Sequence, residues 1–181
     1  MNKRIGIIGA MACEVDPLIA QMQDAQTLTV GSIKFTHGML CGKDTVIAQC
    51  GIGKVFAAMC AQTMILHFGV GAIVNVGVAG SLCDALRIGD IAVATKTVQH
   101  DMDTSPIGDP VGLISGINLV YLPCSERLCD LLASCIEAQG VHYVRGTVAS
   151  GDVFVASPVQ RARITSNFDA VACEMEGGAV A

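Results

Sequence analysis

The chain has 181 residues, of which 52% are hydrophobic and 15% are charged, and its formal net charge is −5. This composition excludes an intrinsically disordered chain and is sufficient for one domain with a sizeable core. The negative charge and the scattered lysines and arginines argue against nucleic-acid binding. The apolar excess favours either an oligomer interface or a large core.

No segment of the sequence is typical of a signal peptide or a membrane span. The basic start at residues 1–4 precedes an apolar stretch that is short and has no cleavage-site pattern. The longest charge-free run, residues 68–83, contains several glycines and is shorter than a membrane-spanning helix. We therefore expect no interaction with a membrane.

The nine cysteines are interpreted as reduced thiols. No Cys-x-x-Cys pair occurs, and Cys60, Cys129 and Cys135 fall in apolar periodic segments. This pattern favours a cytoplasmic protein over a disulfide framework or a metal site. The four histidines show no ligand spacing, so we predict no metal and no cofactor.

Strands and helices are expected to alternate along the chain, because β-branched runs alternate with apolar segments of helical period. The expected elements, in chain order, are a strand at 4–11, a helix at 15–22, antiparallel strands at 27–40 and 44–50, a helix at 53–69, strands at 72–80 and 90–101, a helix marked by 128–136, a strand at 141–152, a helix at 157–168, a strand at 170–175 and a helix that begins at 176. Ser157 and Pro158 are a typical N-cap and first helical residue. This alternation predicts an α/β domain over residues 1–181 with a mixed, mostly parallel sheet.

Ligands of such sheets bind at the carboxyl ends of the strands. Four junctions of this kind carry a glycine-rich turn or a carboxylate, namely residues 9–14, 77–81, 150–155 and 174–178. Their convergence predicts a functional site.

The first three junctions each leave two interpretations open. Glu14 begins a helix, where it is either a surface carboxylate favoured by the helix dipole or a general base. The glycines of residues 77–80 either allow backbone amides to approach a ligand or form an ordinary turn. Phe154, in the turn of residues 150–155, either stacks on a flat base or belongs to the core.

The fourth junction has two glutamates around Met175. In a strand alternate side chains share a face, so Glu174 and Glu176 are expected to point the same way. Either each carboxylate binds a donor, or one stays protonated beside the other. The alternative is an edge strand with one wet face.

These motifs occur together in the order seen in one enzyme family. The stretches "IGIIGAM", "GIGKV", "NVGVAGSL", "SGDVF" and "CEMEGGAVA" resemble motifs of bacterial 5′-methylthioadenosine/S-adenosylhomocysteine nucleosidases, which belong to the purine nucleoside phosphorylase-like superfamily. The resemblance runs from residue 5 to residue 181. It implies a three-layer α/β/α fold of the phosphorylase/hydrolase type, and hydrolysis of an N-glycosidic bond that releases adenine and a thioribose product.

On the matching positions, the resemblance implies that Glu14 activates the attacking water. Met175 and Glu176 match the ribose-binding pair, whose glutamate accepts hydrogen bonds from the sugar hydroxyls. Glu174 is expected to help order the water or its neighbours. Carboxylates suit these roles because glycosidic cleavage passes through an oxocarbenium-like sugar.

The base-binding part of the site is implied in the same way. Phe154 matches the ring that stacks on adenine, and Val155 matches the residue whose backbone hydrogen-bonds the base edge. Ala79 and Gly80 line the site near the glycine turn, and Ile52 lies near the sugar.

Residues 100–108 resemble a loop that, in the family, reaches the alkylthio pocket of a neighbouring subunit. The resemblance therefore implies a cytoplasmic homodimer that binds a small nucleoside substrate and acts in methionine salvage.

The sequence also departs from the family. Val78 stands where a serine is common, and Thr104 and Ile107 differ from the usual pocket residues, so no preference for an alkylthio group carries over. The family's general acid is an aspartate in a Ser-Asp pair, one strand beyond the match to residues 174–181. We therefore expect a C-terminally truncated chain without the last strand and helix, of low stability because a sheet edge is unpaired.

Other functions stay open beside this one. A phosphate-dependent purine nucleoside phosphorylase is disfavoured because no arginine cluster suited to phosphate is present. A futalosine-type hydrolase would act on another purine nucleoside. A non-catalytic homologue would bind nucleosides without the general acid.

Overall fold

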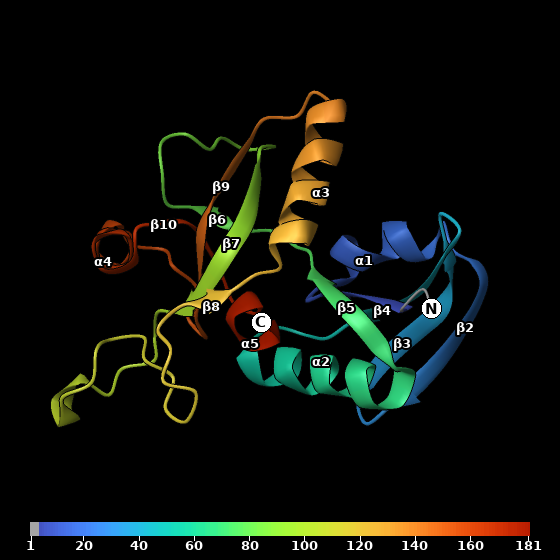
Figure 1. The fold of residues 1–181 in the computed structure, drawn as a ribbon, viewed down its shortest axis with the longest axis horizontal. Helices are drawn as coiled ribbons and strands as arrows, with labels where there is room; N and C mark the ends of the chain where they lie inside the picture. Colours follow the sequence, from blue (N-terminus) through green and yellow to red (C-terminus); the bar gives the residue numbers. More distant parts are fainter. Residues whose placement is uncertain (1–3) are drawn as a thin grey trace. The chain divides into compact units, whose positions relative to one another are not determined.

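The computed structural model describes residues 4–181, which form two five-stranded sheets with helices packed against them (Figure 1). Contacts divide the chain into two compact units, the first of residues up to Val78 together with Val180, and the second of the other residues from Ala79 onward. The α/β class expected from the sequence is confirmed. The single sheet is not, because the strands pair in two separate sets.

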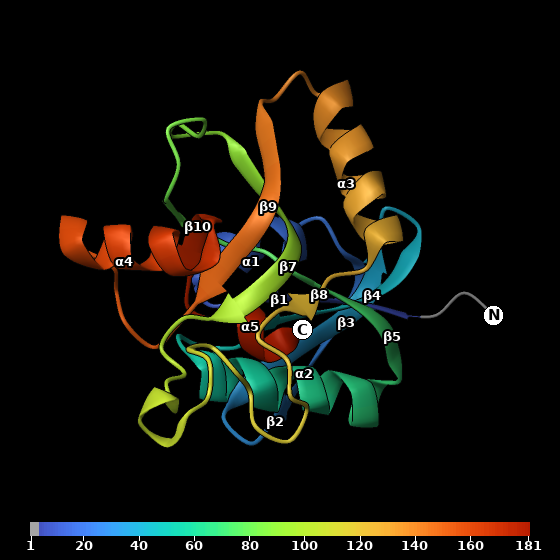
Figure 2. The ribbon, with the colours of Figure 1, turned by 60° about the vertical axis from the view of Figure 1, so that its left-hand side comes forward.

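The first unit contains β1 (Arg4–Gly9), α1 (Ala12–Ile19), β2 (Gln23–Val30), β3 (Ile33–Leu40), β4 (Lys43–Gln49), α2 (Lys54–Phe68) and β5 (Val70–Asn75). The sheet order is β2-β3-β4-β1-β5, with β1 parallel to both neighbours and β2, β3 and β4 antiparallel. In both views α1 and α2 lie on opposite sides of this sheet (Figures 1 and 2).

The apolar sequence of β1 fits its place in the middle of this sheet. Ile8 is fully buried, as a strand covered by helices on both faces requires. A Cβ at Gly6 would lie 2.7 Å from the sulfur of Met64, so the glycine lets α2 pack closely against β1. The rings of Phe35 on β3 and Phe68 at the end of α2 have centroids 5.0 Å apart.

The second unit contains β6 (Gly80–Ser81), β7 (Ile91–Gln99), the 3₁₀ turn η1 (Ser105–Ile107), β8 (Leu122–Pro123), α3 (Glu126–Ala138), β9 (Tyr143–Ser150), α4 (Pro158–Phe168), β10 (Ala170–Glu174) and α5 (Gly177–Val180). The sheet order is β6-β10-β9-β7-β8, with β9 parallel to β7 and β10. α3 and α4 lie on opposite sides of β7 and β9 in both views (Figures 1 and 2).

The helix α4 forms where the sequence predicts it. The Ser157 hydroxyl accepts a hydrogen bond from the N–H of Gln160 at 3.1 Å, and Pro158 occupies the first helical position. The helix buries Ile164 and Phe168 in a core that also contains Val98 of β7. Short local signals of this kind are sufficient to fix a helix start.

The register of the second sheet places three strand ends side by side. Gln99 at the end of β7 pairs with Ser150 at the end of β9, and Ser150 pairs with Glu174 at the end of β10. Because these strands are parallel, their carboxyl ends meet at one edge of the sheet, where ligands of α/β proteins bind.

The structure differs from the expected elements in several details, and α1 begins and ends three residues earlier than expected. The strand expected at 27–40 is two strands, β2 and β3, separated by a turn at Gly31, whose φ is +60°. The strand expected at 72–80 ends at Asn75. The described sheets are mixed, as expected, but parallel pairing is confined to β1 with β4 and β5 and to β9 with β7 and β10, so it is not the majority. Within residues 4–181, the model contains no helix with the length and apolar character needed to cross a membrane.

Candidate functional site

Three backbone amides bind the carboxylate of Glu14 at the carboxyl end of β1. Oε2 accepts hydrogen bonds from the N–H of Ala10 at 2.8 Å and of Met11 at 2.9 Å. Oε1 accepts one from the N–H of Val78 at 2.9 Å, from a loop 64 residues further along the chain. The bond from Met11 is the backbone half of a capping box at the start of α1. Glu14 is therefore a fixed, half-buried carboxylate and not a mobile surface group.

The turn after β5 needs a glycine at position 77 because it passes directly beside the Glu14 carboxylate. A Cβ at Gly77 would lie 2.7 Å from Oε1 of Glu14 and 3.0 Å from Cδ, which is closer than side-chain atoms approach. Gly77 therefore allows the backbone to come close enough for Val78 to donate its hydrogen bond.

The loop that carries Ile52 lies beside the same strand end. The N–H of Cys50 donates to the carbonyl of Gly9 at 2.9 Å, and the N–H of Gly51 donates to the carbonyl of Ala10 at 3.2 Å. The Ile52 side chain is 57% exposed. In the first unit, two predicted site residues thus lie near the end of β1, Glu14 in the first turn of α1 and Ile52 in the loop after β4.

Glu174 and Glu176 do not share a strand face, so this expectation is wrong. β10 ends at Glu174, and Glu176 lies in the bend that follows, where the alternation of a strand no longer applies. Oε2 of Glu174 accepts hydrogen bonds from the N–H of Glu176 at 2.9 Å and of Gly177 at 2.6 Å. Its Oε1 accepts a hydrogen bond from the hydroxyl of Ser150. The carboxylate of Glu174 therefore binds the turn that carries Met175 and Glu176.

Gly80 lies next to this strand end and Ala79 immediately precedes it. Gly80 is in β6 and pairs with Cys173 of β10, and a Cβ at Gly80 would lie 3.2 Å from the Cys173 sulfur. Burial raises the pKa of the Cys173 thiol, which keeps this group neutral beside the glycine. In the second unit, Ala79 and Gly80 are thus brought to the end of the strand that precedes Met175 and Glu176.

Phe154 is not a core residue, because the residue is 82% exposed to solvent. It lies in the loop between β9 and α4. The neighbouring Asp152 donates its backbone N–H to a carboxylate oxygen of Asp101 at 2.8 Å, which ties this loop to the segment after β7. The structure thereby removes the interpretation of Phe154 as a packing residue and leaves the ring open to a ligand.

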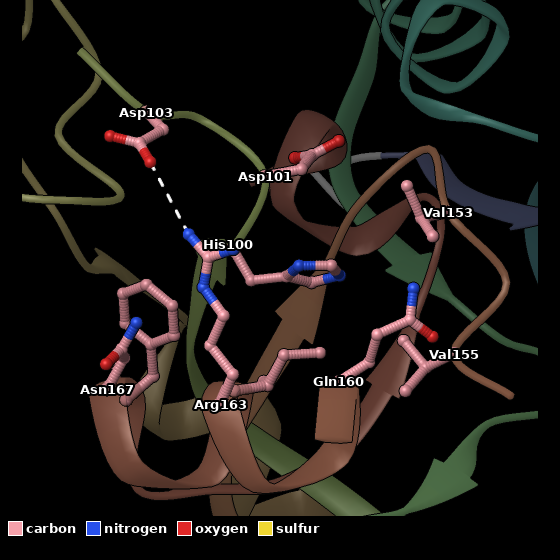
Figure 3. Close-up of a pocket in the computed structure, with 10 residues that line it drawn as sticks. His100, Asp101, Asp103, Val153, Val155, Gln160, Arg163 and Asn167 are labelled. Atoms are coloured by element: carbon pink, nitrogen blue, oxygen red, sulfur yellow. Dashed lines mark hydrogen bonds and ion pairs between the residues drawn. The ribbon is translucent and has the colours of Figure 1, made fainter. Parts of the chain in front are cut away.

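A pocket of about 300 Å³ is lined in part by Val153 and Val155 of the same loop (Figure 3). α4 contributes Gln160, Arg163 and Asn167, which face the segment with His100 and Asp103, and Val155 forms part of the wall. A hydroxyl and a backbone amide of Ser105 donate to Asp103 and lower the pKa of its carboxyl, and Arg163 lies 3.5 Å from it.

Sequence reasoning placed Ser150 in a junction without giving it a role, and it missed Gln99. The Ser150 hydroxyl accepts a hydrogen bond from the N–H of Gly178 at 2.6 Å, and the side-chain amide of Gln99 donates to the Gly178 carbonyl at 2.7 Å. Gln99 ends β7 and Ser150 ends β9, and the rule that ligands bind at strand ends is the signal that could have identified them. Among residues 4–181, no group of three or more His, Cys, Asp or Glu side chains is arranged to bind a metal ion.

The chain belongs to the phosphorylase superfamily, whose sequence profile matches residues 4–181. A 5′-methylthioadenosine/S-adenosylhomocysteine nucleosidase of Shewanella putrefaciens is 36% identical over 179 residues, which are 98% of this chain and 78% of the relative. At this identity and coverage, the chain is a member of the nucleosidase family within that superfamily.

Solved structures agree with this assignment. A mutant of the Helicobacter pylori nucleosidase, with 5′-methylthioadenosine in its active site, is 37% identical and superposes with a TM-score of 0.95 over 100% of this chain and 78% of its own. A futalosine hydrolase structure of the same organism is also 37% identical, with a TM-score of 0.94 over 99% of this chain and 77% of its own. The chain therefore has the α/β fold of this family.

Proposed function

We propose that the protein hydrolyses the N-glycosidic bond of 5′-methylthioadenosine and S-adenosylhomocysteine, and releases adenine and the thioribose product. The observation that carries this proposal is the carboxylate of Glu14, fixed by three amides at a strand end. The nucleosidases of Shewanella putrefaciens and Helicobacter pylori, which are named for these substrates, support it.

Glu14 is the general base in this proposal. A carboxylate has about four lone-pair positions, two on each oxygen. Oε2 accepts two hydrogen bonds and Oε1 accepts one, so Oε1 can accept another from a water molecule. The fixed carboxylate then removes a proton from this water as the glycosidic bond breaks.

Glu176 and Met175 bind the sugar in this proposal. Glu176 is 8% exposed, so its side chain is largely removed from water. A carboxylate in such a place accepts hydrogen bonds from the sugar hydroxyls and stabilises the positive charge that develops on the sugar. Glu174 acts on the backbone of the same turn.

The exposed ring of Phe154 stacks on adenine, and the backbone of Val155 hydrogen-bonds the edge of the base. Ala79, Gly80 and Ile52 complete the contacts. The support for Phe154 is its exposure, which leaves the face of the ring accessible to a flat base.

We further propose that residues 4–181 belong to a single domain and that the protein is a homodimer. The single profile match over this range supports the first point. For the second, α2 exposes a set of large apolar side chains, namely Val55, Phe56, Met59, Ile65 and Leu66. A second copy that covers them would remove this surface from water.

A cytoplasmic location and a role in methionine salvage complete the proposal. The support for the location is that none of the nine cysteines forms a disulfide. The role follows from the substrates proposed above, since both are thioethers derived from methionine.

A second candidate activity is hydrolysis of futalosine. It is favoured by the Helicobacter pylori futalosine hydrolase, which is as similar in sequence to this chain as the nucleosidase structure is. Both reactions break an N-glycosidic bond with water, so they differ in substrate and not in the chemistry assigned to Glu14.

The experiment is a measurement of adenine release from 5′-methylthioadenosine by the protein, expressed from its complete coding sequence, with and without phosphate. Hydrolysis predicts the same rate in both buffers and free thioribose as the product. Release that depends on phosphate and yields a sugar 1-phosphate would identify a phosphorylase instead. Futalosine is tested in parallel.

A further inference from the structure

Three residues at neighbouring strand ends bind the turn after β10. The register pairs Gln99 of β7 with Ser150 of β9, and Ser150 with Glu174 of β10. Each of the three side chains hydrogen-bonds the turn formed by residues 176–178. The proposed function uses this turn for its sugar-binding carboxylate, but assigns no role to Ser150.

The hydroxyl of Ser150 is central to these contacts. It donates to Oε1 of Glu174 and accepts from the N–H of Gly178 at 2.6 Å. Ser150 has no exposed surface, so water cannot replace either bond at low cost. A single buried hydroxyl therefore links the end of β10 to the turn.

Glu174 binds the other side of the same turn. Its Oε2 accepts the N–H of Glu176 at 2.9 Å and the N–H of Gly177 at 2.6 Å. Hydrogen bonds to an ionised carboxylate are among the stronger ones in proteins. Together, Ser150 and Glu174 thus bind the three consecutive amides that follow Met175.

The turn also packs tightly against these side chains. A Cβ at Gly178 would lie 3.0 Å from both Cβ and Oγ of Ser150, and one at Gly177 would lie 3.3 Å from the Glu174 carboxylate oxygens. The backbone of the turn therefore has little room to move toward either residue.

We propose that Ser150 and Glu174 are positioning residues, which fix the backbone at residues 176–178 and so orient the Glu176 carboxylate toward the sugar hydroxyls. This inference rests on the proposed function. It gives Ser150 a role in the reaction without contact with the substrate, and it changes the role of Glu174 from ordering the water to orienting Glu176.

The first test is a double-mutant cycle on adenine release. Ser150→Ala is expected to lower kcat/KM about 10- to 100-fold, the effect of losing a hydrogen bond to a charged group. If Ser150 acts through Glu176, the same change costs no more than about twofold once Glu176→Gln is present. Equal losses in both backgrounds would show that Ser150 acts on stability alone, and would overturn the proposal.

Thr97→Val is the matched control, because it also removes a buried hydroxyl near the end of β7. No hydrogen-bond partner of the Thr97 hydroxyl is found among the described residues. This variant is expected to keep the wild-type kcat/KM and the affinity for adenine measured by calorimetry. Ser150→Ala is also expected to keep the adenine affinity, since the base does not contact Glu176. A loss of adenine affinity in Ser150→Ala alone would indicate general damage to the site.

Hydrogen exchange gives a second readout that needs no activity. The Gly178 amide is expected to exchange at least about tenfold faster in Ser150→Ala than in Thr97→Val, because it loses its acceptor. Glu174→Gln is expected to act on the amides of Glu176 and Gly177. If Ser150→Ala and Glu174→Gln leave the exchange rates of the amides at residues 176–178 unchanged, the positioning role is contradicted. If the wild-type protein releases no adenine, the proposed function is wrong, and the exchange result alone decides the role of Ser150 and Glu174.

Discussion

Gly77 lies so close to the carboxylate of Glu14 that a side chain at position 77 would displace this carboxylate. The position of a Cβ on Gly77 is 2.7 Å from Oε1 of Glu14, the oxygen that accepts a hydrogen bond from Val78. The loop after β5 and the first turn of α1 therefore determine together where this carboxylate lies. The orientation of the Glu14 carboxylate therefore requires both a glycine at position 77 and the hydrogen bonds from the three backbone amides.

Gly77→Ala is accordingly expected to lower kcat for adenine release by at least about tenfold, because a base displaced from its water loses most of its effect. Gly31→Ala is the control. Gly31 has a φ of +60° and open space around its Cβ position, so its substitution costs about 1 kcal/mol of unfolding free energy without touching the site. Equal kcat values for the two variants would contradict the role of Gly77.

Phe154→Leu separates stacking from packing. The residue is 82% exposed, so the free energy of unfolding should change by less than about 0.5 kcal/mol. Loss of base stacking, about 1–3 kcal/mol, should raise KM for the nucleoside by about 5- to 150-fold. Steady-state kinetics and urea unfolding measure the two quantities. A destabilised variant with unchanged KM would show that the ring packs and does not bind the base.

Asp44 gives the first unit a pH-dependent stability. Arg4 donates a hydrogen bond to its carboxylate at 2.9 Å and lowers the pKa of Asp44, and His37 lies 3.0 Å away. A lowered folded-state pKa stabilises the protein above the unfolded value of about 4, and this contribution is lost as the pH falls through the folded-state value.

At pH 7, Asp44→Asn should therefore cost less than about 1 kcal/mol of unfolding free energy, since the carboxylate is 44% exposed and screened by water. The difference from wild type should decrease below about pH 4. Urea unfolding at several pH values measures it, with Asp84→Asn on an exposed turn as the reference. A difference that stays constant from pH 7 to pH 3 would exclude the ion pair as its cause.

The thiols are expected to react in order of exposure. Burial raises the pKa of the Cys60 thiol on α2 to about 12, so hardly any thiolate exists at pH 8. Cys13 and Cys41 are exposed. Mass spectrometry after brief alkylation of the folded protein should find label on Cys13 and Cys41, and label on Cys60 only after unfolding in urea. Labelling of Cys60 at the same rate in both states would contradict its burial.

Local signals in the sequence predicted the elements better than their pairing. The start of α4 follows from Ser157 and Pro158, which act within one helical turn. The division into two sheets depends on contacts between distant strands, which no local pattern contains. For this reason the class of fold could be predicted and the arrangement of the sheets could not.

The site shows the same contrast. The position of Glu14 at a strand end was correct, because the end of β1 and the start of α1 are adjacent in sequence. Glu174 and Glu176 were expected to share a face, but the strand stops at Glu174 and its carboxylate binds the following amides. The role of Ser150, which fell within the predicted junction 150–155, was not foreseen because its partners, Glu174 and Gly178, lie 24 and 28 residues away and are brought to it by strand register.

The most direct test of the account is a comparison of Glu14→Gln with Glu126→Gln in the phosphate-free release of adenine from 5′-methylthioadenosine. Both glutamates lie in the first turn of a helix, so both changes remove the same favourable interaction with the helix dipole. Only Glu14 is proposed as the base, and its loss should lower kcat by about 10²- to 10⁴-fold while Glu126→Gln keeps the wild-type value. Adenine release by Glu14→Gln at the rate of Glu126→Gln would contradict the account.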